Sequence, residues 1–374
     1  MSANRYQDPP RRRRSNKERK KRLLIRRTLV VLAGVLLVAA VAGVIYGVTR
    51  LAGGEKPGTT ASSSSAASAP ASSQAMPAKP DETAKGEPLE VKKDGLTGYE
   101  ALYPDMYVQT KPGKWKDPVT KTVYLTFDDG PSKLTQPLLE ELKKYNVKAT
   151  FFLTNQPNQK DYIGEIRKIY EAGHVCAVHS ATHDYPTIYR SVEAYLKDFY
   201  DMWKIIQEQT DGHCAPFFRF PGGSNNPQGG SEEVRADIQK EMLRRGFFYY
   251  DWDIDSRDAE GARAAAIYTN VTGGMSRDGN MPLMHNIAGK EATLQQVPKI
   301  IEYGQQNGYT FLPMDGTLDP STFLLGGVGK DAFFSVVGNS PNFEVSDAHK
   351  KQFAEKLGLA SSPSSQENGD GGQE

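Results

Sequence analysis

Two neighbouring aspartates in the middle of the chain could divide the work of a metal-assisted hydrolysis. Asp128 and Asp129 directly follow an apolar run, KTVYLTF. Because neighbouring residues of an extended chain point to opposite faces, one carboxylate can bind a metal ion while the other stays available as a base. Alone, an Asp-Asp-Gly sequence is also typical of an ordinary turn, so this prediction needs partners elsewhere in the chain.

His179 and His183 are candidate partners, because they follow another apolar run, HVCAV, and lie four residues apart. On a helix this spacing would place both imidazoles on one face. Two histidines and one carboxylate form a site with open coordination positions, which suits zinc or a similar divalent ion. A histidine pair alone is more often structural, so the prediction depends on its combination with the aspartates.

Three more polar clusters follow later apolar runs. Arg219 lies in PFFRF, and its charge near Asp128 would keep that carboxylate ionised; the alternative is a surface salt bridge. His285 ends MPLMH and could donate a proton from the opposite side of a bound group; the alternative is a hydrogen-bonded structural histidine. Four aspartates surround the end of an intervening run: Asp251, Asp253, Asp255 and Asp258.

Apolar runs of strand length alternate with helical periodicity between residues 119 and 313, which is typical of repeated strand–helix units. The expected strands cover residues 121–127, 148–153, 174–178, 216–220, 247–252, 281–285 and 309–312. About seven such units predict an α/β fold with a parallel barrel, closed or incomplete. Because the carboxyl ends of barrel strands meet at one end, this fold would bring the polar clusters together.

The charge is distributed unevenly along the chain. Its formal net charge is +1, but residues 1–27 carry +10 and the remainder carries −9. A nucleic-acid-binding domain is therefore disfavoured, although the basic segment alone could serve as a nucleic-acid-binding tail. Thr28–Val48 is an uncharged apolar stretch of 21 residues, long enough to span a bilayer.

The membrane topology follows from this charge distribution by the positive-inside rule. We predict a cytoplasmic basic segment (1–27), a single-pass anchor in the cell membrane (28–49) and an extracellular remainder. The alternative is a cleaved signal peptide, but the apolar stretch is longer than the core of most such peptides. The basic residues before it would also be attracted to anionic lipids.

Composition sets the other boundaries. Residues 50–95 are rich in small and polar side chains and predict a disordered extracellular linker. The folded domain is expected at 96–315, with its motifs in 119–313. Residues 316–374 are predicted to form a C-terminal extension that is partly disordered, because the end of the chain is strongly polar.

The chain has only two cysteines, Cys176 and Cys214, which excludes a disulfide scaffold and a cysteine-rich zinc site. Each lies at or near the start of an expected strand. Two alternatives remain, a single disulfide bridge or two small buried thiols. In either case the domain must fold mainly on its apolar core.

Five segments of the expected domain resemble the motifs of a known enzyme family. TFDDGPS, HSATH, RFPGG, DSRDA and LMH, in this order, resemble the motifs of the polysaccharide deacetylase domain (NodB-type, carbohydrate esterase family 4). The resemblance covers Val119–Pro313, about half of the chain. It is most similar to membrane-anchored peptidoglycan N-acetylglucosamine deacetylases of Gram-positive bacteria and implies an irregular (β/α)7-type barrel.

The resemblance implies roles for the first polar groups. Asp128 would be the catalytic base, and Arg219 would position it. Asp129, His179 and His183 would bind one divalent metal ion. Zinc is the expected metal, with cobalt, nickel or manganese as alternatives.

It also implies an acid and a substrate pocket. His285 would be the general acid, supported by Asp258. The backbone N–H of Gly222, next to Pro221, would contribute to an oxyanion site. Leu283 would line the pocket for the acetyl methyl group.

Two positions depart from the usual motifs. Ala259 stands where the family often has tryptophan, and Asn286 where it often has aspartate. Neither change removes a catalytic group, but Ala259 leaves one wall of the glycan groove less aromatic and leaves the sugar preference open.

The implied reaction is metal-dependent hydrolysis of N-acetyl groups of peptidoglycan N-acetylglucosamine, with release of acetate. The alternatives are another acetylated polysaccharide, such as a chitin-like polymer, poly-N-acetylglucosamine or xylan, and a non-catalytic glycan-binding protein. The last alternative is disfavoured because none of the expected ligands, the base or the acid is missing from the sequence. No protein partner is indicated.

Overall fold

The structure is a computed structural model that describes residues 87–228, 230–275, 279–338 and 340–344. The predicted basic segment, the predicted span Thr28–Val48 and most of the predicted linker lie outside these residues, as does 345–374. No helix in the described part of the chain is long and apolar enough to cross a membrane.

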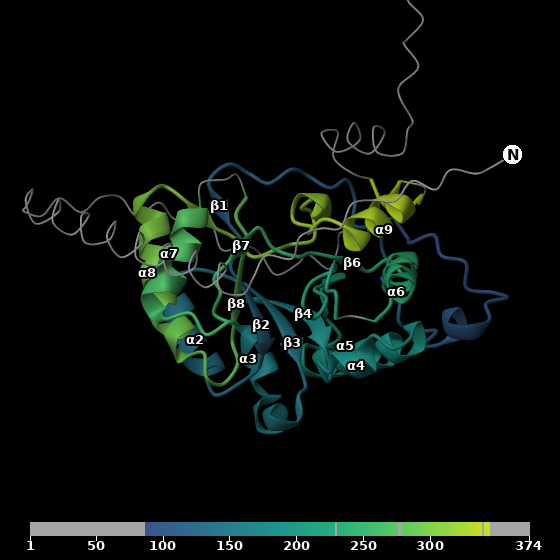
Figure 1. Cartoon of the computed structure of the whole chain (residues 1–374), viewed down its shortest axis with the longest axis horizontal. Coiled ribbons are helices and arrows are strands. Elements are labelled where there is room, and N and C mark those ends of the chain that lie inside the picture. Colours follow the sequence, from purple (N-terminus) through teal and green to yellow (C-terminus); the bar gives the residue numbers. More distant parts are fainter. Residues whose placement is uncertain (1–86, 229, 276–278, 339, 345–374) are drawn as a thin grey trace, which may run out of the picture. The chain divides into compact units, whose positions relative to one another are not determined.

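A parallel sheet of seven strands forms the centre of the fold (Figure 1). In sheet order, the strands are β6 (Phe248–Tyr249), β5 (Phe217–Phe218), β4 (Val175–Ser180), β3 (Thr150–Thr154), β2 (Thr126–Gly130), β8 (Pro282–His285) and β7 (Ile254–Asp255). The edge strands β6 and β7 are consecutive in the chain, and no pairing among the described residues joins them. The predicted α/β fold with parallel strands is confirmed, and the barrel is incomplete.

The seventh predicted strand forms, but it does not belong to the main sheet. Residues 309–312 contain β9 (Thr310–Phe311), which pairs with β1 (Thr122–Val123) in a separate two-stranded sheet. The seventh strand of the main sheet is instead β7, which has two residues, of which only Ile254 is buried. A strand this short has too little periodicity to be recognised in a sequence.

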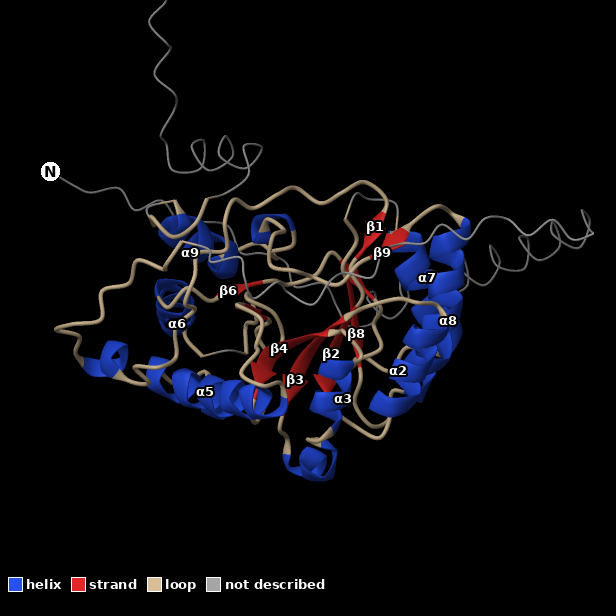
Figure 2. Ribbon diagram, turned by 180° about the vertical axis from the view of Figure 1, so that it is seen from behind, coloured by secondary structure: helices blue, strands red, loops and turns tan. Residues whose placement is uncertain are grey.

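Helices lie around the outside of the sheet (Figure 2). The α-helices are α2 (Thr135–Lys144), α3 (Glu165–Glu171), α4 (Tyr185–Ile188), α5 (Val192–Gln209), α6 (Glu232–Arg244), α7 (Ala264–Gly274), α8 (Glu291–Gln306) and α9 (Val328–Val337). The 3-10 helices are η1 (Gly98–Ala101), η2 (Pro157–Tyr162) and η3 (Pro320–Thr322). Ser191 and Ser231 cap α5 and α6, because each side chain accepts a backbone N–H of the first turn.

Aromatic side chains dominate the core. In β3 all five residues are buried, as expected for a parallel strand covered on both faces. Fully buried rings from neighbouring strands include Phe127, Phe151, Phe152, Phe217, Phe218 and Phe248. Burying each such side chain stabilises the fold by roughly 1.5–3 kcal/mol. A tightly packed aromatic core therefore supports the strand ends that carry the polar clusters.

The segments before and after the motif region (119–313) also pack into the aromatic core of the fold. The Trp115 ring lies 5.2 Å from that of Phe248, 5.7 Å from that of Phe333 on α9 and 5.2 Å from that of Phe343. Helix α9 also packs against α6. The first part of the C-terminal extension therefore packs on the motif core, whereas the domain borders drawn from composition stay predictions.

Both cysteines are free thiols in the structure. Cys176 is buried in β4, and Cys214 is partly buried shortly before β5. Burial raises the pKa of both thiols, so neither is an activated nucleophile.

The strand register brings the polar clusters to one edge of the sheet. Asp128 in β2 is aligned with His285 in β8 on one side and with Phe152 in β3 on the other. His179 lies near the end of β4, and Arg219 directly follows β5. The parallel arrangement thus places four chemically active side chains at the carboxyl ends of neighbouring strands.

Candidate metal and catalytic site

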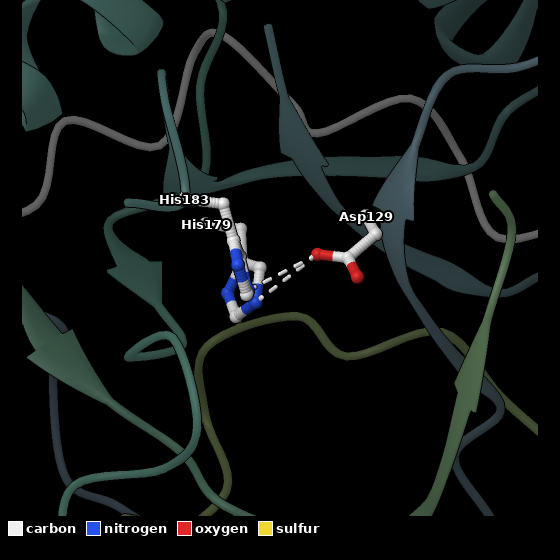
Figure 3. A group of neighbouring side chains, drawn as sticks. All are labelled: Asp129, His179 and His183. Carbon is white, nitrogen blue, oxygen red and sulfur yellow. Dashed lines mark ion pairs between the residues drawn. The ribbon is translucent and has the colours of Figure 1, made fainter. Parts of the chain in front are cut away.

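Asp129, His179 and His183 lie together at the ends of β2 and β4 (Figure 3). Asp129 Oδ1 is 3.4 Å from His183 Nε2 and 3.6 Å from His179 Nε2. All three potential ligand atoms lie within 4.8 Å of one another. In the described residues this is the one group of three such side chains with metal-binding geometry.

These side chains fit one divalent ion. Two zinc bonds of about 2.1 Å at a tetrahedral angle separate the donor atoms by about 3.4 Å. Asp129 Oδ1 is also buried without a hydrogen-bond partner among the described residues, so a cation would satisfy an oxygen that is costly to bury. Burial and the charge of His183 lower the pKa of His179 well below its usual value, which favours the neutral imidazole that binds metals.

The two histidines do not share a helix, so the helical placement considered for them is wrong. His179 lies in β4, and His183 lies in the following turn with a φ of +57°. His179 Nδ1 is 2.7 Å from the backbone oxygen of Arg219, to which it can donate, and this contact leaves Nε2 directed at Asp129. The turn, rather than helical periodicity, brings the imidazoles together.

Asp198 supports this turn and was not predicted from the sequence. It lies on the buried face of α5 and accepts four hydrogen bonds of 2.6–2.9 Å, from Ser180 Oγ, Ala181 N, Thr182 N and Thr182 Oγ1. Ser180 Oγ in turn accepts the backbone N–H of His183 at 2.8 Å. A carboxylate between apolar positions of an amphipathic helix was the sequence signal for this role.

Asp129 is held in an unusual backbone conformation. Its φ of +65° is in the left-handed region, which costs a non-glycine residue about 1–3 kcal/mol. Its backbone oxygen accepts hydrogen bonds from Thr154 Oγ1 at 3.1 Å and from Gln159 Nε2. These contacts stabilise the turn at Asp129, whose side chain faces His179 and His183.

Asp128 and Arg219 form a buried ion pair beside the metal ligands. Arg219 Nη1 is 2.8 Å from Asp128 Oδ1, and the side chains are 0% and 2% exposed. Arg219 also donates to Thr126 Oγ1 and to the backbone oxygens of Tyr250 and Asp251. Burial raises the pKa of Asp128, and the charges of Arg219 and His285 oppose this rise.

His285 is oriented by Asp258, as the motifs imply. His285 Nδ1 lies 2.7 Å from Asp258 Oδ1, and the backbone N–H of His285 donates to Asp258 Oδ2 at 2.8 Å. Thr293 Oγ1 donates to the same carboxylate. A proton on Nδ1 is therefore held by Asp258, and Nε2 is left to exchange a proton with a ligand.

Pro221 and Gly222 form a turn after β5, and this turn contains a backbone N–H that is available to a ligand. Gly222 is exposed and has a φ of +75°, and its backbone N–H donates to no acceptor in the described part of the chain. The Pro221 oxygen accepts hydrogen bonds from Tyr189 at 2.8 Å and from Asn226 at 3.2 Å. The turn is thus fixed on one side, while the Gly222 N–H remains available to a ligand. Leu283 is two residues before His285 in β8 and is 7% exposed.

Of the four clustered aspartates, only Asp258 contacts His285. Asp253 accepts the backbone N–H of Met281, and Asp255 accepts that of Arg257. Asp251 is fully buried and accepts the backbone N–H of both Ser224 and Leu325. It therefore joins the Pro221–Gly222 turn to the C-terminal segment.

The two departures from the motifs have different surroundings. Asn286 is buried, donates its side-chain amide to Thr135 Oγ1 at 2.9 Å, and donates its backbone N–H to the backbone oxygen of Asp128 at 2.8 Å. Asn286 therefore holds the backbone of Asp128, the candidate catalytic base, in place. Ala259 is exposed, and nothing in the structure explains why it stands there.

Comparison with known proteins identifies the family to which this chain belongs. The polysaccharide deacetylase family model matches residues 116–240. A putative polysaccharide deacetylase of Bacillus subtilis, YheN, is 31% identical over 54% of this chain and 69% of its own length. A peptidoglycan-N-acetylglucosamine deacetylase of Bacillus cereus is 30% identical over 54% of this chain and 72% of its own length.

A solved structure agrees with these relatives. The catalytic domain of a peptidoglycan N-acetylglucosamine deacetylase from Eubacterium rectale is 38% identical, with a TM-score of 0.52, over 57% of this chain and 97% of that domain. The chain belongs to the polysaccharide deacetylase family. It is a hydrolase that removes acetyl groups from a polysaccharide with the help of a divalent metal ion.

Proposed function

We propose that the chain removes acetyl groups from the N-acetylglucosamine residues of peptidoglycan. The observation that carries this proposal is that three side chains able to bind a metal ion lie at the same edge of the sheet as a buried carboxylate, Asp128, and an oriented imidazole, His285. Amide hydrolysis needs a polarised carbonyl, an activated water molecule and a proton donor for the amine at the same time. The site offers a residue for each need.

Asp129, His179 and His183 would hold the metal ion. When bound, a zinc ion supplies a Lewis acid that polarises the acetyl carbonyl and makes water easier to deprotonate. Asp128 takes one proton from the attacking water molecule, whose oxygen forms the new bond to the acetyl carbon. Arg219 keeps Asp128 in place, because its guanidinium group is fixed by four hydrogen bonds.

The remaining groups complete the reaction. The Gly222 N–H donates to the carbonyl oxygen as it gains negative charge. His285 then donates a proton to the nitrogen as the carbon–nitrogen bond breaks, so that acetate and a free amine leave. Leu283, with Pro221 nearby, would contact the acetyl methyl group. The amine is cationic near neutral pH, so each turnover adds positive charge to the glycan.

We expect Asp258→Asn to move the alkaline limit of activity to lower pH. Burial lowers the pKa of His285, but the hydrogen bond and charge of Asp258, with the charges of Asp129 and Asp128, raise it to about 9. His285 is protonated and able to donate below this pKa, and it loses the proton as the pH rises through it. Without the Asp258 charge, activity should fall about tenfold or more at pH 8 and much less at pH 6.

A pH–rate profile from pH 5 to 10 measures this shift. Asp255→Asn is the matched control, because it makes the same change three residues away at an exposed side chain and should keep the wild-type profile. An equal loss of activity at every pH in Asp258→Asn would show that Asp258 has a structural role only.

The substrate part of the proposal rests on the relatives and on the predicted location. Acetate release by the full chain from purified peptidoglycan and from a chitin oligomer should be compared at equal acetyl concentration. We expect faster release from peptidoglycan. Faster release from the chitin oligomer, from poly-N-acetylglucosamine or from acetylated xylan would mean that this glycan, and not peptidoglycan, is the preferred substrate. A relative from Pseudobutyrivibrio xylanivorans that is 29% identical is a bifunctional xylanase/deacetylase, which makes xylan a relevant control.

We also propose that Thr28–Val48 anchors the enzyme in the cell membrane with the catalytic domain outside. The uncharged span and the basic residues before it support this topology. The linker predicted after the span would let the domain reach the wall glycan. Amino-terminal sequencing of the membrane fraction should find residues 1–27 still attached; a mature start between about residues 45 and 75 would mean a cleaved signal peptide.

A further inference from the structure

Tyr185 lies beside the metal ligands but has no role in the motifs. It is the first residue of α4, two residues after His183, and is half-buried. Its ring centroid is 5.3 Å from that of His183. Because α4 directly follows the turn that Asp198 fixes, the position of this ring is coupled to that of the metal ligand.

The Tyr185 hydroxyl lies next to the candidate oxyanion donor. A Cβ atom built on Gly222 would be 2.8 Å from Tyr185 Oη and 2.2 Å from Asn226 Nδ2. The left-handed φ of Gly222 also disfavours a side chain there. A side chain at position 222 would therefore meet both the Asn226 amide and the Tyr185 hydroxyl, so this hydroxyl lies close to the backbone that carries the open Gly222 N–H.

Tyr185 and the neighbouring Tyr189 use their hydroxyl groups differently. Their ring centroids are 6.1 Å apart, at the first residue of α4 and at the residue that directly follows it. Tyr189 is 2% exposed, and its hydroxyl donates to the Pro221 oxygen at 2.8 Å. The Tyr185 hydroxyl, in contrast, makes no hydrogen bond to a described residue. Tyr189 holds the turn, whereas Tyr185 presents a donor to whatever occupies the site.

We propose that the Tyr185 O–H donates a hydrogen bond to the acetyl oxygen of the substrate and strengthens it as that oxygen gains negative charge. Tyr185 would thus be a second protein donor of the oxyanion site, beside the Gly222 N–H. No proton is transferred in this contact. The inference rests on the proposed function of the site, but not on the identity of the glycan.

Tyr185→Phe in the full chain tests the proposal. Removing one oxyanion donor of a pair should lower kcat and kcat/KM by about 10²- to 10³-fold, with KM changed less than about threefold. The metal content and the thermal unfolding temperature should stay at the wild-type values. The affinity for a tetrahedral phosphonamidate analogue of the acetylated glycan should fall by a similar factor.

Tyr268→Phe is the matched control. Tyr268 is a half-buried tyrosine on α7 whose ring meets that of Tyr303 edge to face, and its hydroxyl makes no hydrogen bond to a described residue. This variant should behave as the wild type. A wild-type kcat in Tyr185→Phe, or a loss found only in KM, would overturn the proposal for Tyr185 while leaving the deacetylase function standing. A wild-type chain that releases acetate from neither peptidoglycan nor a chitin oligomer would instead overturn the function and this inference together.

Discussion

Asp128→Asn should lower the rate of deacetylation by about 10²- to 10⁴-fold, the contribution of a general base. The amide keeps the volume of the carboxylate and can still accept the 2.8 Å hydrogen bond from Arg219. It cannot take a proton from water. Because Asp128 is not among the proposed metal ligands, the metal affinity should change by only a few-fold.

Both quantities must be measured on the same samples, by acetate release and by elemental analysis. Asp129→Asn is the informative counterpart, because the two aspartates are adjacent but have different contacts. It should lose metal, whereas Asp128→Asn should retain it. The opposite pattern would mean that the roles of the two aspartates are reversed.

Replacing both His179 and His183 with alanine should abolish stoichiometric metal binding and reduce acetate release to background. Each imidazole supplies one of the three expected ligands, and a single carboxylate binds zinc weakly in water. Asp129 Oδ1 would then have neither a metal ion nor a described hydrogen-bond partner.

Metal content after dialysis is the direct measurement, together with thermal unfolding to show that the variant is folded. His213→Ala is a suitable control, because it removes a partly exposed histidine that stacks on Tyr170, away from the ligands. It should retain one metal ion per chain. A folded double variant that still holds one zinc ion would refute the ligand assignment.

The sequence predicted the parts of the site that depend on strand ends. Short apolar runs, each followed by polar residues, were sufficient to place Asp128, His179 and His285 at one edge of a parallel sheet, and the register confirms this edge. The reason is general, since parallel strands must all end on the same side.

Other parts of the site depend on contacts between distant residues and could not be predicted. Asp198 supports a turn 16–18 residues away, and this role requires knowing where α5 packs. His183 reaches Asp129 because its own backbone lies in the left-handed region. Its spacing from His179 had suggested a helix instead. The proximity of the Tyr185 hydroxyl to Gly222 likewise joins two segments that are separate in the chain.

Acetate release before and after metal removal tests the central claim most directly. The full chain should be incubated with an N-acetylated glycan as purified, after exhaustive chelation, and after zinc is restored, with the free amine counted in parallel. The account predicts equal amounts of acetate and amine, loss of both on chelation, and recovery of both with zinc. Release that persists at full rate after every metal ion has been removed, or no release under any condition, would contradict it.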